Sequence, residues 1–248
     1  MKGKNILVMS IVCLLCINAC KTREKSSSGG VSTDVTGIYT GMLPCADCPG
    51  IETKIELKKD LTYIMQTKYV EKSEEIFTQS GKYQWDMQKG IITFDNRLVG
   101  QCLVEGNTLT VMIDGKKPTE ETTGNYVLEK VDLALVEKYW KLVELYGKPV
   151  AVNDSNAKEA HIIFKIEGNR FNGDAGCNRF AGSYHVKKSG GIVFSQTIAT
   201  RMMCLNMDIE TQFLQALGTA DSYAVHKDTL ELSKTGAPLA RFVVVYLK

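Results

Sequence analysis

Short runs in which apolar and polar residues alternate recur along most of this 248-residue chain. The clearest run places Ile51, Ile55 and Leu57 on one side, and the next run does the same with Tyr63 and Met65. A period of two is typical of β-strands that bury one face. Turn signals separate these runs closely: Lys59-Asp60, Lys89-Gly90, Glu105-Gly106-Asn107 and Asp114-Gly115. Short strands at this spacing, with no long helical pattern between them, predict an antiparallel barrel or sandwich over residues 37–130.

A second block of expected strands begins near Val131. Its last run, at residues 241–247, is apolar almost throughout, which is typical of a strand inside a sheet. One helical pattern interrupts the block, with Asn206 as the N-cap, Asp208 and Glu210 in the first turn and Gly218 as the stop. Residues 131–248 are therefore predicted to form an α+β domain in which one helix covers an antiparallel sheet. Its other expected strands lie at residues 140–145, 161–166, 170–175, 192–197, 222–225 and 229–232.

The N-terminus has the pattern of a bacterial export signal. Lys2 and Lys4 precede an apolar run at residues 6–17, and Cys20 follows a small residue. The run is shorter than the roughly 18 residues of a membrane-spanning helix, so residues 1–19 are predicted to be removed. The sequence before Cys20 resembles the lipobox of bacterial lipoprotein signals, which implies a lipid anchor on Cys20. Ordinary secretory cleavage beside an incidental cysteine is the alternative.

The residues after the cleavage point predict a tether and a location. Residues 20–36 are polar and rich in serine and glycine, so they should act as a flexible tether between the membrane and the folded part. Lys21 stands where an aspartate is associated with inner-membrane retention in some bacteria, so an outer-membrane location is expected. Removing Lys2 and Lys4 lowers the formal net charge from +2 to 0, and this balance argues against a nucleic-acid partner.

Cysteine usage narrows the chemistry of the mature chain. Of eight cysteines, two leave with the signal and Cys20 is expected to carry lipid. Five cysteines remain, an odd number, which in an oxidising envelope allows two disulfides and one free thiol, or a metal site made of thiols. The five are Cys45, Cys48, Cys102, Cys177 and Cys204.

The densest motif spans residues 41–51, Gly-Met-Leu-Pro-Cys-Ala-Asp-Cys-Pro-Gly-Ile. Two thiols three positions apart can close a disulfide, hold a soft metal ion or exchange electrons with another dithiol. A proline, a glycine and an alternating strand follow Cys48, where a redox enzyme would have a helix to lower the thiol pKa. A redox-enzyme role is therefore disfavoured.

Residues 37–130, which contain this motif, resemble the N-terminal domain of the NlpE family of copper-resistance lipoproteins. The resemblance implies a small lipocalin-like barrel in an outer-membrane lipoprotein, with a role in copper tolerance and in signalling envelope stress to a partner protein. It also implies that Cys45 and Cys48 act as a pair. A structural disulfide is the first interpretation of that pair, and capture of Cu(I) is the alternative.

The second block resembles the META domain of the heat-shock protein HslJ. The shared motifs are Gly-Cys-Asn-Arg at residues 176–179, Gly-Ser-Tyr at 182–184, Thr-Arg-Met-Met-Cys at 200–204, and Glu210. The resemblance implies no known reaction. A Cys177–Cys204 disulfide would tie the middle strands to the start of the helix, whereas a soft-metal site would use these cysteines with Met202, Met203 or Met207. Cys102 is expected to be a buried free thiol.

The sequence therefore predicts a tethered, mainly β lipoprotein that binds or senses and does not catalyse. Its histidines, His161, His185 and His226, lack the paired spacing of metal ligands, and no nucleophile, base and orienting group occur together. No cofactor is expected unless Cys45 and Cys48 hold Cu(I). A structural or adhesion role, in which the cysteines form only disulfides, is the other alternative.

Overall fold

A computed structural model describes residues 34–150, 158–187, 191–204 and 207–246 of the chain. The expected signal peptide, Cys20, most of the expected tether and the expected helix cap at Asn206 lie outside these residues. Within the described part, no helix is long and apolar enough to cross a membrane.

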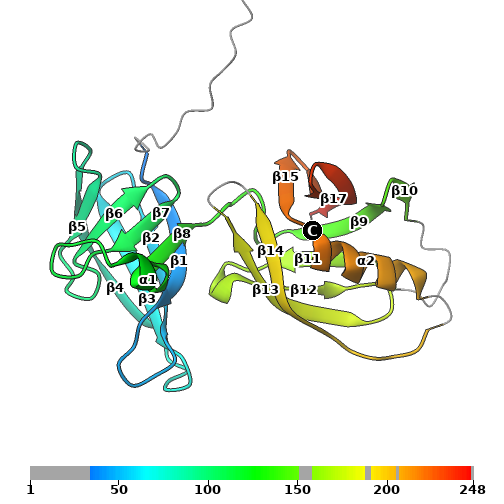
Figure 1. The fold of residues 1–248 in the computed structure, drawn as a ribbon, viewed down its shortest axis with the longest axis horizontal. Coiled ribbons are helices and arrows are strands. Elements are labelled where there is room, and N and C mark those ends of the chain that lie inside the picture. Colours follow the sequence, from blue (N-terminus) through cyan, green and yellow to red (C-terminus); the bar gives the residue numbers. More distant parts are fainter. Residues whose placement is uncertain (1–33, 151–157, 188–190, 205–206, 247–248) are drawn as a thin grey trace, which may run out of the picture. The chain divides into compact units, whose positions relative to one another are not determined.

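The first domain is a closed antiparallel β-barrel (Figure 1). Consecutive strands pair with one another, and β1 also pairs with β8, so that Tyr39 faces Lys130 and the barrel closes. Closure leaves no free edge on which another chain could add a strand. A short helix, α1 (Glu120–Thr123), and a 3₁₀ turn, η1 (Gly124–Tyr126), precede β8. The eight strands are β1 (Gly37–Leu43), β2 (Ile51–Leu57), β3 (Thr62–Tyr69), β4 (Phe77–Asp86), β5 (Ile91–Phe94), β6 (Gln101–Glu105), β7 (Thr108–Val111) and β8 (Val127–Lys130).

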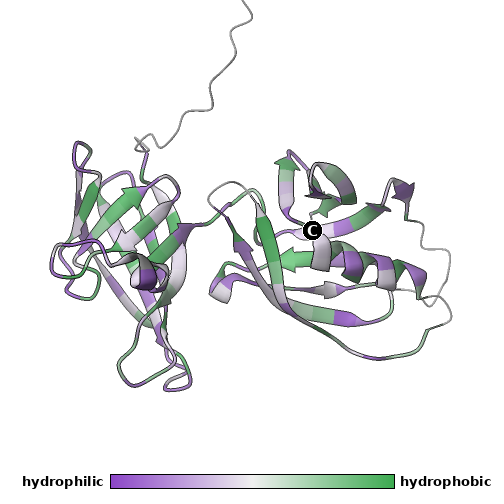
Figure 2. Ribbon diagram, in the orientation of Figure 1, coloured by the Kyte–Doolittle hydropathy of each residue, from purple (hydrophilic) through white to green (hydrophobic). Residues whose placement is uncertain are grey.

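The alternating residues of the barrel strands place their apolar side chains in the barrel core. Along β2, every second residue from Ile51 to Leu57 is buried, and the residues between them are half-exposed. Figure 2 shows the same alternation of hydrophobic and hydrophilic residues on neighbouring barrel strands. Burial of each large apolar side chain contributes about 1.5–3 kcal/mol. The predicted antiparallel barrel is confirmed, and its largest fully buried side chains are Tyr39, Ile55, Leu57, Met65, Ile92, Leu109 and Leu128.

The second domain is one antiparallel sheet with a helix. The strands follow the order β14-β13-β12-β11-β9-β17-β16-β15, and β10 pairs with β9. The apolar strand β17 lies between β9 and β16, the interior position that its composition predicts. A 3₁₀ turn, η2 (Glu167–Asn169), joins β11 to β12. The strands are β9 (Tyr139–Leu145), β10 (Lys148–Pro149), β11 (His161–Phe164), β12 (Arg170–Asp174), β13 (Arg179–Val186), β14 (Ile192–Ala199), β15 (Ser222–His226), β16 (Thr229–Lys234) and β17 (Ala237–Val245).

Helix α2 (Asp208–Thr219) packs against β9, β14, β16 and β17 and completes the core of the second domain. Its buried Phe213 meets Phe180 of β13 edge to face, with the ring centroids 5.3 Å apart. The helix ends one residue after the expected stop, so the prediction that Gly218 terminates it is wrong. Gly218 keeps the helical backbone, and the helix ends because Ala220 takes an extended conformation while its N–H still bonds to the carbonyl of Ala216.

Candidate functional site

Cys45 and Cys48 lie in the loop that joins β1 to β2 and form a disulfide, with their Cα atoms 5.3 Å apart. Both cysteines are half-buried, and the residues between them are exposed. The two strands that flank the loop pair along their whole length, from Gly37 opposite Leu57 to Leu43 opposite Ile51. This hairpin fixes the loop at one end of the barrel.

Asp47 places a carboxylate beside the two sulfur atoms. Ligand atoms of Cys45, Asp47 and Cys48 all lie within 4.8 Å of one another. On its other side Asp47 forms an ion pair with Lys72, and the hydrogen bond and charge of that lysine lower the pKa of the carboxyl group. Asp47 is therefore ionised at neutral pH, and its charge is paired with that of Lys72 beside the two sulfur atoms.

The surroundings of the loop restrict its chemistry. Cys45 follows β1 and precedes β2, so it does not stand at the start of a helix, where the reactive cysteine of a thioredoxin-like site stands. While the disulfide is closed, neither sulfur is a thiolate, and thiolates are the form that binds soft metals. The structure shows the loop as a closed disulfide, and a soft metal ion would require the reduced dithiol.

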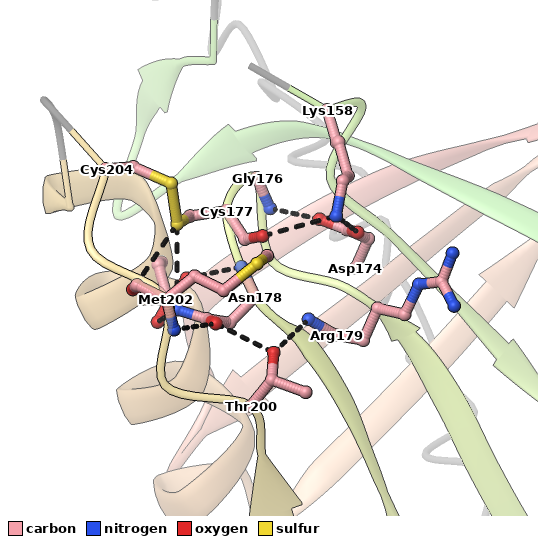
Figure 3. The surroundings of a disulfide bond; sticks show 10 residues. Lys158, Asp174, Gly176, Cys177, Asn178, Arg179, Thr200, Met202 and Cys204 are labelled. Carbon is pink, nitrogen blue, oxygen red and sulfur yellow. Dashed lines mark hydrogen bonds and ion pairs between the residues drawn. A yellow bond between two sulfur atoms is a disulfide. The ribbon is translucent and has the colours of Figure 1, made fainter. Parts of the chain in front are cut away.

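A second disulfide joins Cys177 to Cys204 in the other domain (Figure 3). Cys177 is buried and follows β12, whereas Cys204 is exposed and precedes α2. The bond closes a sequence separation of 27 residues that contains β13 and β14. It thereby holds the segment before the helix against the turn between β12 and β13.

Asn178 is the centre of the hydrogen bonds around this disulfide (Figure 3). Its side-chain N–H groups donate to the Met202 carbonyl at 3.0 Å and to Glu210 Oε1 at 2.9 Å. Its side-chain oxygen accepts from the Met202 N–H and the Thr200 hydroxyl, both at 2.7 Å. Because Asn178 is 1% exposed, these bonds replace water and hold residues 200–202 in one conformation.

Glu210 has a role in this network that the sequence pattern did not predict. The pattern placed Glu210 in the first turn of the helix as a charge facing the helix dipole. In the structure its side chain is buried and accepts the backbone N–H of Asn178 at 2.8 Å as well as the side-chain bond. One feature of the sequence could have identified this role: Glu210 belongs to the same set of shared motifs as Cys177 and Asn178.

Comparisons with known proteins assign both domains. Residues 39–130 match the NlpE N-terminal domain, and residues 132–245 match the META domain. The chain joins an NlpE N-terminal domain to a META domain. It is 28% identical over 137 residues to lipoprotein NlpE of Escherichia coli, and the match covers 52% of this chain and 58% of that protein. The chain therefore spans a little over half the length of that relative, and this homology supports a location in the cell envelope.

Solved structures also resemble the chain, among them one from Shewanella oneidensis and one from Escherichia coli. A protein of Shewanella oneidensis is 34% identical, and the likeness covers 40% of this chain and 92% of that one with a TM-score of 0.37. The Cpx pathway activator NlpE from Escherichia coli is 16% identical, with 68% and 98% covered and a TM-score of 0.29.

Cys102 and the three histidines take no part in the two disulfides. Cys102 is fully buried in the NlpE domain, and Ile92 lies opposite it on the paired strand β5. Burial raises the pKa of its thiol to about 12. The three histidines of the META domain lie on β11, β13 and β15. Met203 is 96% exposed.

Among the described residues, one group of cysteine, histidine or acidic side chains has its ligand atoms close enough to hold a metal ion. That group is Cys45, Asp47 and Cys48.

Proposed function

We propose that this protein is an envelope lipoprotein that senses stress, through the Cys45–Cys48 loop of its NlpE domain. The observation that carries the proposal is a half-buried pair of cysteines, with exposed residues between them, on a paired hairpin in a domain of this family. The related lipoprotein NlpE is a Cpx pathway activator in Escherichia coli, which points to an envelope signalling protein as the partner. The role is one of binding and signalling, without catalysis.

The proposed anchor is a lipid on Cys20, in the outer membrane. It rests on the lipobox-like sequence and on Lys21 after the anchor residue. The polar segment to residue 36 would let both domains reach partners at a distance from the bilayer. An oxidising envelope would keep the Cys45–Cys48 pair closed until a thiol reductant supplies the two electrons that open it.

Copper is the second candidate signal, and the donor atoms of the loop suit it. Once reduced, Cys45 and Cys48 supply two thiolates, the ligand type that selects Cu(I). The thioether of Met42 packs against Gly50, where an added Cβ would come within 2.5 Å of the sulfur atom. Met42 therefore places a third soft donor, a thioether, at the Gly50 end of the loop. A bound Cu(I) ion would add positive charge at this end of the barrel.

A direct test of sensing compares strains that express the full-length wild-type chain, a Cys45→Ser plus Cys48→Ser variant, or a Cys177→Ser plus Cys204→Ser variant. Envelope-stress transcripts are measured with and without copper or a thiol reductant. The proposal expects the response to depend on the first pair. A response that is the same in the wild type and the Cys45/Cys48 variant would assign the cysteines a structural or adhesion role.

Copper binding is tested separately on purified protein. The reduced chain should remove one Cu(I) from a chromophoric chelator in competition, and the Cys45/Cys48 double variant should lose that uptake. The Cys177/Cys204 double variant is the matched control, because it also lacks two sulfur atoms. An unchanged copper stoichiometry in the Cys45/Cys48 variant would exclude this loop as the copper site.

A further inference from the structure

The META domain contains a groove of about 840 Å³ on the face of its sheet away from the helix. Cross-strand register explains its position: His161 of β11 faces Asp174 of β12, and Asp174 faces Arg179 of β13. These side chains form one wall across three neighbouring strands. The next row on the same face holds the shorter side chains Asn172 and Ala181, which leaves the groove open beside that wall.

One of the charged side chains that line the groove has no ionic partner. Lys158 pairs with Asp174 at 3.4 Å, and Glu159 pairs with Lys141 at 2.5 Å, so these four groups neutralise one another. No described residue forms a hydrogen bond or ion pair with the guanidinium of Arg179. In Figure 3 this guanidinium points away from the Asn178 network, while the Arg179 backbone N–H bonds to Thr200. Among the described charged residues that line the groove, Arg179 is therefore the one whose side chain has no ionic partner, and it is exposed.

An aromatic surface lies at the opposite end. The rings of Tyr139 and His161 stack with their centroids 4.2 Å apart and their planes within 16°. Both residues line the groove, and both are half-exposed. Neighbouring strands are roughly 4.8 Å apart, so two strand spacings separate His161 from Arg179 by about 10 Å. The groove thus offers a cation and a flat apolar surface at a distance that a small organic molecule can span.

We propose that this groove binds a small organic carboxylate, with the carboxylate on Arg179 and a flat apolar body against Tyr139 and His161. The planar guanidinium matches a carboxylate in a bidentate arrangement. A phosphate monoester fits less well, because it brings close to two negative charges beside the carboxylates of Asp174 and Glu159. A groove of this volume lies within the range of small-molecule sites. This inference is independent of the Cys45–Cys48 loop, which lies in the other domain.

The test uses the full-length protein in detergent and 4-(4-fluorophenyl)butyrate as the probe. Binding is followed by the broadening of its fluorine NMR signal, with empty detergent micelles as the blank. We expect saturable binding to the wild type and at least tenfold weaker binding of the corresponding carboxamide, which lacks the charge. Equal binding of the acid and the amide would overturn the proposal.

Three variants locate the site. Arg179→Gln should weaken binding of the acid about tenfold or more, and Tyr139→Leu should weaken both the acid and the amide. Arg170→Gln is the matched control, because it removes an exposed arginine from the same sheet outside the groove and should leave binding unchanged. Circular dichroism confirms that each variant is folded. Wild-type affinity in Arg179→Gln, or an equal loss in Arg170→Gln, would refute the assignment.

Discussion

Glu210 accepts two hydrogen bonds from Asn178, one from its backbone N–H at 2.8 Å and one from its side-chain amide at 2.9 Å. The two residues belong to elements 32 positions apart in sequence, the turn after β12 and the first turn of α2. Asn178 directly follows Cys177 of the Cys177–Cys204 disulfide, so the covalent bond and the hydrogen bonds of Asn178 hold the same segment. The start of the helix is therefore fixed by tertiary contacts more than by a cap, since Met207 makes no side-chain capping bond.

Replacement of Glu210 by alanine should lower the free energy of unfolding of the META domain by about 3 kcal/mol, because it leaves two buried N–H groups of Asn178 without an acceptor. Urea unfolding followed by Trp140 fluorescence, in a Trp85→Phe background, measures this. Gln212→Ala is the control, because Gln212 is exposed on the same helix and should change stability by less than about 0.5 kcal/mol. Equal stability of the two variants would show that the contact is not needed.

Loss of the Cys177–Cys204 disulfide should destabilise the META domain by about 3 kcal/mol, because the closed loop restricts the unfolded chain. Loss of the Cys45–Cys48 disulfide should have a smaller effect on the NlpE domain, because its loop is much shorter. Urea unfolding of the two double serine variants, each with and without reductant, compares the two. A larger effect from the shorter loop would contradict the chain-entropy explanation.

Cys102 should resist alkylation in the folded protein at pH 8 and react in urea, because its thiol is buried and its pKa is raised to about 12. Mass mapping of protein purified without reductant measures the modification, and modification of native Cys102 would contradict its burial. The raised pKa also has a consequence for stability. An unfolded thiol ionises near pH 8.5, so the contribution of the protonated thiol is complete below that pH.

That contribution is lost as the pH rises from about 8.5 toward 12, at up to about 1.4 kcal/mol per pH unit. Cys102→Ala should remove this part of the pH dependence. The comparison of unfolding free energies at pH 8 and pH 10, for the wild type and the variant, tests the sign. A steeper alkaline loss of stability in the variant would contradict it.

Cys20→Ser should release the protein from the membrane fraction, because one residue carries all the expected acyl chains. Sucrose-gradient fractionation and intact mass measure the location and the lipid. Lys21→Asp is a second variant, and it should move the protein to the inner membrane in a host that uses that retention signal. A Cys20→Ser protein that remains in the membrane fraction would contradict the lipid anchor.

Much of the fold follows from local sequence. The alternation from Ile51 to Leu57 predicted a strand, and β2 buries every second residue over the same range. The apolar run near residue 241 predicted an interior strand, and β17 lies inside the sheet. These predictions succeed because the period of two and the choice of turn residues are properties of neighbouring residues. The helix was also predicted, although it ends at Thr219 and not at Gly218.

Other features depend on contacts between distant residues. Strand β13 was not predicted, because Gly182 interrupts its pattern. An added Cβ at Gly182 would come within 2.6 Å of the Phe171 ring, so that partner explains the glycine. The pairing of β1 with β8, the burial of Glu210 against Asn178 and the groove at Arg179 likewise join segments far apart along the chain. Local sequence carries the pattern of each strand, whereas tertiary packing decides which polar side chains lose their contact with water and which keep it.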